Sequence, residues 1–167
     1  MKKLIRLPIF LLAFSSLVNA QEAKGLLAQE EDLRESVFRY QFEHVEHDAS
    51  GLEKGAKFYF LSIRGEKLGR AEGQDPSNEF LKRFEGIIPT VKKVSQCSKM
   101  SGVRDKETGE EGLIVFQDGR IQWISDTEVE VGGGYYRGNQ GSSSGEYRVV
   151  KEGSRWVVKK GEMLLIS

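Results

Sequence analysis

Alternating apolar and polar positions dominate the last third of the chain. The clearest example is residues 127–131, in which Val129 and Val131 share one face and Glu128 and Glu130 share the other. Successive side chains of a β-strand point to opposite faces of the sheet. The segment therefore predicts a strand with one face in the core and the other in water.

Similar strand-like runs surround this segment. Branched and aromatic residues concentrate at positions 113–116, 120–125, 146–151, 155–160 and 163–166. Asp118 and Gly119 separate the first two runs and predict a hairpin, because a type I′ turn needs positive φ at both central residues. Gly153 marks a second hairpin turn. The last run is apolar on both faces, which predicts a strand in the middle of the sheet or beneath a helix.

Three consecutive glycines, Gly132, Gly133 and Gly134, follow the alternating segment. Such a run inside a strand usually marks a bulge or bend, so we expect the sheet to curve here. A phosphate-binding loop is the alternative, but such loops lead into the N-terminus of a helix. Here Tyr135 and Tyr136 follow instead, and the bend is favoured.

The first half of the chain predicts helices. Apolar and aromatic residues recur at three- and four-residue steps within residues 21–50, which indicates an amphipathic helix. A short second helix is expected to begin with Asp75 as its N-cap and Pro76 at the first helical position. Residues 57–63 predict a strand between the two helices.

These elements together predict an α+β fold. A long N-terminal helix packs on a curved antiparallel sheet of about five to six strands, with a short second helix beside it. Trp123 and Trp156 lie in strands of that sheet. We interpret them as core residues rather than as a ligand cage, because large aromatic residues in strands usually pack in the interior.

The first twenty residues have the order of a secretory signal peptide. Basic residues precede an apolar run at positions 7–18, and the segment ends in the small residue Ala20. The run is about a dozen residues long against the roughly twenty that span a bilayer, which disfavours a membrane anchor. We expect a signal peptide at residues 1–20 and a single exported domain at residues 21–167, periplasmic or extracellular in a bacterium, with no membrane span after cleavage.

Charge and cysteine content narrow the classes of function. Removal of the signal leaves 22 basic and 25 acidic residues, a net charge of −3. A mildly acidic domain without a basic stripe is a poor candidate for nucleic-acid binding, which depends on neutralising phosphates. The single cysteine, Cys97, cannot form an intrachain disulfide, and its sequence neighbours supply no activating base. We interpret it as a small buried residue.

One cluster has the composition of a metal site. Glu43, His44 and His47 are spaced to share one face of a helix, where they could hold a divalent transition metal. The spacing is not the His-Glu-x-x-His arrangement of zinc proteases, and no further ligand is identifiable. A solvated helix end is favoured, with the histidines near the C-terminal side of the dipole. No cofactor is expected.

Residues 146–158 resemble the closing hairpin of the nuclear transport factor two-like superfamily, which includes SnoaL-type polyketide cyclases and ketosteroid isomerases. The stretch has the aromatic strand, glycine-containing turn and tryptophan-containing strand found there. Residues 79–84 and 124–129 are also similar to stretches of a group of exported bacterial proteins of unknown function. The superfamily resemblance implies a cone with a pocket between the helices and a concave sheet. Its enzymes use an Asp or a His–Asp pair as general base, and no position here matches that motif.

The sequence favours a module that binds a small ligand or a protein partner, because no catalytic constellation is evident. A small hydrolase or isomerase acting on an apolar ligand is one alternative, and an assembly domain that forms a homodimer through the open sheet face is another. The pocket candidates are Tyr135, Tyr136 and Asp126. Asp105 or a helix histidine would be further candidates if the protein is an enzyme.

Overall fold

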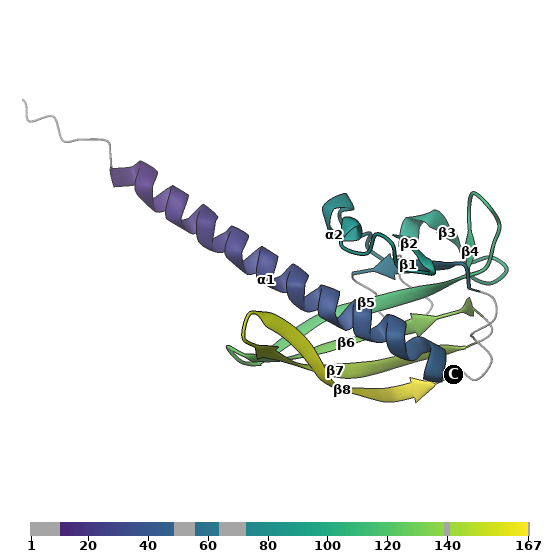
Figure 1. The fold of residues 1–167 in the computed structure, drawn as a ribbon. Helices are drawn as coiled ribbons and strands as arrows, with labels where there is room; N and C mark the ends of the chain where they lie inside the picture. The colour runs from purple at the N-terminus through teal and green to yellow at the C-terminus, as the bar shows by residue number, and fades with distance from the viewer. Residues whose placement is uncertain (1–10, 49–55, 64–72, 139–140, 167) are drawn as a thin grey trace, which may run out of the picture.

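The computed structural model describes residues 11–48, 56–63, 73–138 and 141–166. They form an α+β fold in which the long helix α1 (Leu11–Asp48) packs against a six-stranded sheet (Figure 1). The strand order is β2-β1-β5-β6-β7-β8. The strands are β1 (Phe58–Ser62), β2 (Thr90–Lys93), β5 (Gly112–Ser125), β6 (Glu128–Tyr136), β7 (Ser142–Glu152) and β8 (Arg155–Ile166).

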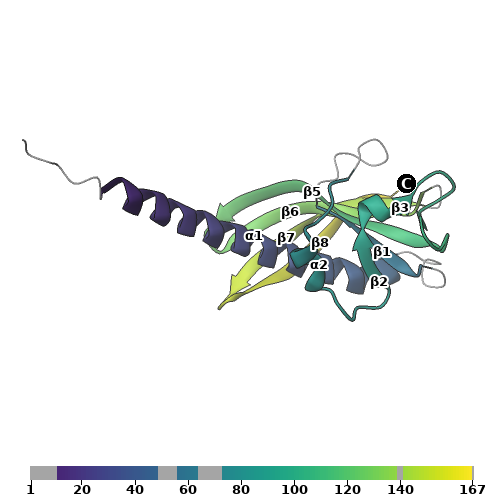
Figure 2. The ribbon, with the colours of Figure 1, turned by 90° about the horizontal axis from the view of Figure 1, so that it is seen from above.

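Smaller elements lie beside the first strands. The short helix α2 (Asn78–Lys82) precedes β2, and a 3₁₀ turn, η2 (Val94–Gln96), follows it. A two-stranded sheet is made by β3 (Cys97–Ser98) and β4 (Arg104–Asp105). In both overall views the β5–β6 and β7–β8 turns lie at the end of the sheet toward which the N-terminal part of α1 projects (Figure 1 and Figure 2).

Strand directions agree with the prediction only in part. Strands β5 to β8 are antiparallel neighbours, but β1 runs parallel to both β2 and β5. A parallel pair needs a long crossover connection, and the segment containing α2 supplies it between β1 and β2. The expectation of a wholly antiparallel sheet is therefore wrong at its β1 side.

The hairpin predicted at Asp118 and Gly119 is also wrong. Strand β5 continues through these residues, and its register with β6 shifts between Gln117 and Ile121. Gly119 has a φ of 82°. Its left-handed conformation, which is also typical of a turn, here forms part of a bulge within a long strand. The turn lies farther on, between β5 and β6, whereas the predicted hairpin at Gly153 is confirmed.

The glycine run does not carry the bulge that was expected of it. Gly132, Gly133 and Gly134 pair without a register shift with β7, and the irregularity opposite them lies in β5. The glycines instead allow close approach of neighbouring backbone. A Cβ atom on Gly134 would lie 1.9 Å from the carbonyl oxygen of Ser143.

The end of the chain forms an edge of the sheet. Strand β8 pairs only with β7 in the sheet order, so the prediction of a central position for residues 163–166 is wrong. The alternative, a strand covered by a helix, agrees with the contacts between α1 and β8. The side chains of 163–166 lie outside the described residues.

The alternating strand is confirmed, and its apolar face forms part of one core cluster. Val129 and Val131 are fully buried and pack with Leu33 and Val37 of α1. On the opposite face Glu128 forms a 2.5 Å ion pair with Arg148 of β7. The two-residue period of the sequence therefore assigned these faces correctly.

The two tryptophans differ in burial. Trp156 is buried, whereas Trp123 is 48% exposed. Trp123 pairs with Val129 and shares the helix-covered face, but it lies near the β5–β6 turn and meets Trp156 edge-on with ring centroids 5.7 Å apart. The core interpretation is correct for Trp156 and wrong for Trp123, because the alternation shows which face a residue shares and not how far along that face the helix reaches.

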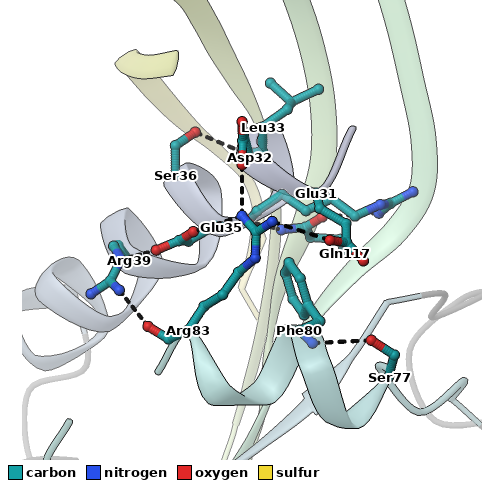
Figure 3. Close-up of polar contacts among 11 residues, drawn as sticks. Glu31, Asp32, Leu33, Glu35, Ser36, Arg39, Ser77, Phe80, Arg83 and Gln117 are labelled. Atoms are coloured by element: carbon teal, nitrogen blue, oxygen red, sulfur yellow. Dashed lines mark hydrogen bonds and ion pairs between the residues drawn. The ribbon is translucent and has the colours of Figure 1, made fainter. Parts of the chain in front are cut away.

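Helix α2 docks on α1 through a charged cluster. Arg83 points from the end of α2 toward α1 carboxylates and lies 2.6 Å from Asp32, 3.0 Å from Glu35 and 3.1 Å from Glu31 (Figure 3). The hydrogen bond with Asp32 raises the pKa of Arg83. The cluster supplements the apolar contacts that bury Phe80 beneath it.

The N-cap of α2 is Ser77 rather than Asp75. The Ser77 hydroxyl accepts a 3.0 Å hydrogen bond from the backbone N–H of Phe80. Asp75 instead accepts from the backbone N–H and the hydroxyl of Ser95, at 2.9 and 2.6 Å. Both residue types cap helices well. Asp75 does not cap α2 because its carboxylate is hydrogen-bonded to Ser95.

Cys97 is buried with Phe60, Val94 and Val103, which confirms its interpretation as a core residue. Burial raises the pKa of the thiol and so disfavours the reactive thiolate. None of the helices in the described part of the chain combines the length and apolar character needed to cross a bilayer.

Asp105 should make stability depend on pH in the acidic range. It is 2% exposed, and the 2.8 Å bond from Lys92 Nζ is the largest cause of a pKa lowered from the ordinary 3.8. A lowered folded-state pKa contributes stability that is present above the unfolded value and is lost as the pH falls through the folded value. Asp105→Asn removes this contribution.

We therefore expect the free energy of unfolding of the wild type to fall more steeply below pH 4 than that of Asp105→Asn. Urea titrations at several pH values would measure both slopes. Asp126→Asn is the matched control, because Asp126 is exposed in the β5–β6 turn. Equal slopes for the wild type and Asp105→Asn would contradict the assignment.

Candidate functional site

A cavity of about 140 Å³ lies between the second half of α1 and the glycine- and serine-rich part of β6, β7 and β8. Its lining combines aromatic rings, polar groups and exposed strand backbone. The lining residues are Tyr40, Gln41, His44, Gly134, Tyr135, Ser143, Gly145, Tyr147, Gly161 and Glu162.

Two glycines allow the helix and the strands around this cavity to approach each other closely. Gly161 faces α1, since a Cβ atom there would lie 2.9 Å from Tyr40 Cε1 and 3.1 Å from the Tyr147 ring. Gly133 lets the helix approach, because its Cβ would lie 3.0 Å from Gln41 Nε2. Substitution of either glycine would therefore alter the space or its polar wall.

Gln41 is the polar centre of the site and is 3% exposed. Its Nε2 lies 3.1 Å from the Phe116 carbonyl oxygen, 3.3 Å from the Tyr147 hydroxyl and 3.4 Å from the Gly134 carbonyl oxygen. Among the described residues, its Oε1 has no hydrogen-bond partner. A buried acceptor without a donor lowers the stability of the folded state by roughly 1–3 kcal/mol.

His44 adds a second acceptor. Its Nδ1 lies 2.8 Å from the carbonyl oxygen of Tyr40. A carbonyl only accepts, so Nδ1 carries the proton, and Nε2 of the neutral ring is left with a lone pair. Stacking on Tyr40, with ring centroids 3.8 Å apart, also positions the imidazole.

The three pocket residues expected from the sequence lie in different parts of the structure. Tyr135 is buried and lines the cavity. Tyr136 packs with the core cluster that contains Phe60, and Asp126 is exposed in the β5–β6 turn. A role in ligand binding stays a prediction for Tyr135, and Tyr136 and Asp126 are not among the residues that line the cavity.

The structure describes the side chains of only two of the three possible metal ligands. Glu43 is exposed, His44 commits Nδ1 to the helix backbone, and the side chain of His47 lies outside the described residues. No group of three His, Cys, Asp or Glu side chains in the described chain could hold an ion. Asp105 would be a pocket candidate only if the protein is an enzyme. It lies on β4, where its carboxylate accepts a hydrogen bond from Lys92.

Sequence reasoning missed Gln41 as a site residue. Gln41 lies on the apolar stripe of α1, four residues after Val37 and three after Phe38. A polar amide in a buried stripe is a signal, because buried polar groups require partners. Its three acceptors come from β5, β6 and β7, which no local pattern could identify.

A second hollow of about 320 Å³ lies between α1 and the β7–β8 turn, beside Trp156 and Arg155. Its acidic side chains already pair within the protein: Glu35 with Arg39, and Asp32 with Arg83. This hollow therefore offers a ligand fewer unsatisfied groups than the cavity around Gln41.

Comparison with models of protein families, with curated proteins and with solved structures gives no match for this chain.

Proposed function

We propose that the chain is an exported binding module that holds a small ligand in the cavity between α1 and strands β6 to β8. The observation that carries the proposal is the cavity of about 140 Å³ itself, which aromatic and polar side chains of α1 and the sheet line together. Sites for small molecules combine an apolar wall with a few placed polar groups. Tyr40, Tyr135 and Tyr147 contribute the wall, and Gln41 and His44 contribute the polar groups.

The cavity volume sets the ligand size. An engineered apolar cavity of about 150 Å³ accepts benzene, and the present cavity is about 140 Å³. A ligand with one ring, or an aliphatic molecule of similar bulk, would fill it. The resemblance to the nuclear transport factor two-like superfamily supports the same location, since a helix against a concave sheet would enclose a pocket there.

Ligand binding is favoured over the hydrolase or isomerase alternative. A general base would have to lie within hydrogen-bond reach of a substrate proton. Glu162 lies at the cavity edge, but its Oε1 is 2.5 Å from Lys160 Nζ. Asp105 and Asp126 lie on other parts of the fold, which leaves His44 without a carboxylate partner among the described lining residues.

Export predicts cleavage after Ala20, a position that falls within α1. The secreted or periplasmic protein should then begin at Gln21. Intact-mass analysis of protein recovered from outside the cytoplasm would measure this. A mass that retains residues 1–20 would contradict the signal-peptide assignment.

Gly161→Ala should abolish ligand binding, because it displaces the two tyrosine rings that line the cavity. Its added methyl group would lie 2.9 Å from Tyr40 Cε1 and 3.1 Å from Tyr147. A screen of single-ring fragments by NMR should shift the backbone amide signals of lining residues in the wild type and not in Gly161→Ala. Gly25→Ala is the matched control, because its methyl group meets nothing within 4 Å.

Two results would contradict the proposal. One is that no fragment shifts the lining residues of the wild type. The other is that Gly161→Ala, with an otherwise unchanged amide spectrum, binds the fragments as the wild type does.

A further inference from the structure

We infer that the exported protein carries a modified N-terminus, in which Gln21 has closed to a pyroglutamate ring. The inference rests on the proposed export, which makes Gln21 the first residue once the signal peptide is removed after Ala20. It follows from the side chain that becomes terminal, from the position of that residue on α1, and from the charge that the end of a helix favours.

A terminal glutamine holds both reactants of this modification in one residue. The α-amine nitrogen attacks the side-chain Cδ carbonyl, so a bond forms between these atoms and the bond from Cδ to Nε2 breaks. Ammonia leaves with the proton that the amine gives up, and the reaction needs no oxidant, reductant or cofactor. Closure of the five-membered lactam is intramolecular and avoids the entropy cost of bringing two molecules together. An α-amine has an ordinary pKa of about 7.7–8.0, so part of it is the free nucleophile at neutral pH.

The position of Gln21 leaves the terminal residue free to react. The N-terminal part of α1, which contains Gln21, projects beyond the sheet (Figure 1). Leu33 is the first buried side chain among the described side chains of α1, and it lies about 18 Å farther along the helix at a rise of 1.5 Å per residue. Between the two, Leu26 and Leu27 are 67% and 64% exposed, and a Cβ atom on Gly25 would meet nothing within 4 Å. Packing against the described sheet therefore does not hold this end of α1 in place.

The end of the helix favours the product. After cleavage the α-amine belongs to the first turn of α1, whose backbone N–H groups have no acceptor within the helix. Hydrogen bonding within the helix therefore does not occupy the attacking nitrogen. The positive end of the helix dipole disfavours a protonated amine at this position. Cyclisation removes that charge, as N-terminal acetylation does.

The modification would protect the exposed end of α1 outside the cell membrane. Aminopeptidases recognise a free α-amine, and a pyroglutamate ring does not provide one. The residues that follow Gln21 would otherwise be open to stepwise removal, because the described side chains at positions 25–28 are all exposed. The ring therefore preserves the part of α1 that the sheet does not cover.

The full chain, exported by a bacterial host and recovered from outside the cytoplasm, tests the inference. After incubation for days at neutral pH, its intact mass should equal that of residues 21–167 less one molecule of ammonia. Tandem mass spectrometry of the N-terminal peptide should place the loss at Gln21. Pyroglutamyl aminopeptidase should then remove the ring and leave a chain that begins at Glu22 with a free α-amine.

Gln21→Asn is the matched control. Asparagine keeps a terminal side-chain amide but is one methylene shorter, so the same attack would require a strained four-membered ring. The exported variant should retain its α-amine and its ammonia. A broad-specificity aminopeptidase should shorten Gln21→Asn and leave the incubated wild type intact.

The outcomes separate the modification from export. A recovered chain that begins at Gln21 and keeps a free α-amine after incubation would overturn the modification and leave export standing. A chain that retains residues 1–20, or that begins at another residue, would overturn both the cleavage site and the modification. Equal loss of ammonia from Gln21→Asn would show that Gln21 is not the residue that reacts.

Discussion

Phe38→Ala is expected to lower the free energy of unfolding by about 3–5 kcal/mol, the usual cost of truncating a buried phenylalanine. Phe38 of α1 is fully buried. Its ring lies 6.2 Å from that of Phe80 and 6.1 Å from that of Phe84, measured between centroids. The substitution leaves a void where α1, α2 and the sheet meet, because these rings belong to one core cluster with Tyr59 of β1.

Urea denaturation followed by circular dichroism would measure the loss. Leu27→Ala is the control, because Leu27 is 64% exposed on the same helix and should change stability by no more than about 0.5 kcal/mol. A loss below about 2 kcal/mol for Phe38→Ala would indicate that the aromatic cluster is not the central packing unit.

Gly134→Ala is expected to be similarly damaging for a different reason. The added Cβ would lie 1.9 Å from the carbonyl oxygen of Ser143 and 2.8 Å from the Ser144 Cα. Both are backbone atoms of β7, so a rotamer change cannot relieve the contact. We expect destabilisation of about 3 kcal/mol, near the upper end of overpacking costs, or failure to fold.

Thermal and chemical unfolding of purified Gly134→Ala would measure this loss. Gly25→Ala provides the contrast, because the same change in an open part of α1 should stabilise by up to about 1 kcal/mol. Wild-type stability in Gly134→Ala would mean that β6 and β7 are farther apart than the register of Gly134 and Ser144 indicates.

The sequence predicted those features that depend on local periodicity. The buried positions of Val129 and Val131, the turn at Gly153 and the buried stripe in the second half of α1 all follow from spacing along the chain. The sequence did not show which of two structural roles a residue with a given local preference takes. Gly119 has the positive φ expected of a turn but lies in a bulge, and Asp75 has the capping chemistry but binds Ser95.

The candidate site was less accessible to sequence reasoning than the fold. The sequence predicts Tyr135 as a pocket residue but does not identify Gln41, and Tyr136 lies in another cluster. Adjacent residues in a strand point to opposite faces. Only the helix position shows which of the two tyrosines meets the cavity.

The amino-acid sequence by itself determined the α+β class, the faces of the alternating strand and the helical stripe, because each depends on residues a few positions apart. The tertiary structure decided the parallel placement of β1, the exposure of Trp123 and the union of Gln41, His44 and Gly161 around one cavity. These features depend on contacts between segments far apart in the chain. Hydrophobic pattern restricts such contacts to a shared face but does not specify which residues meet.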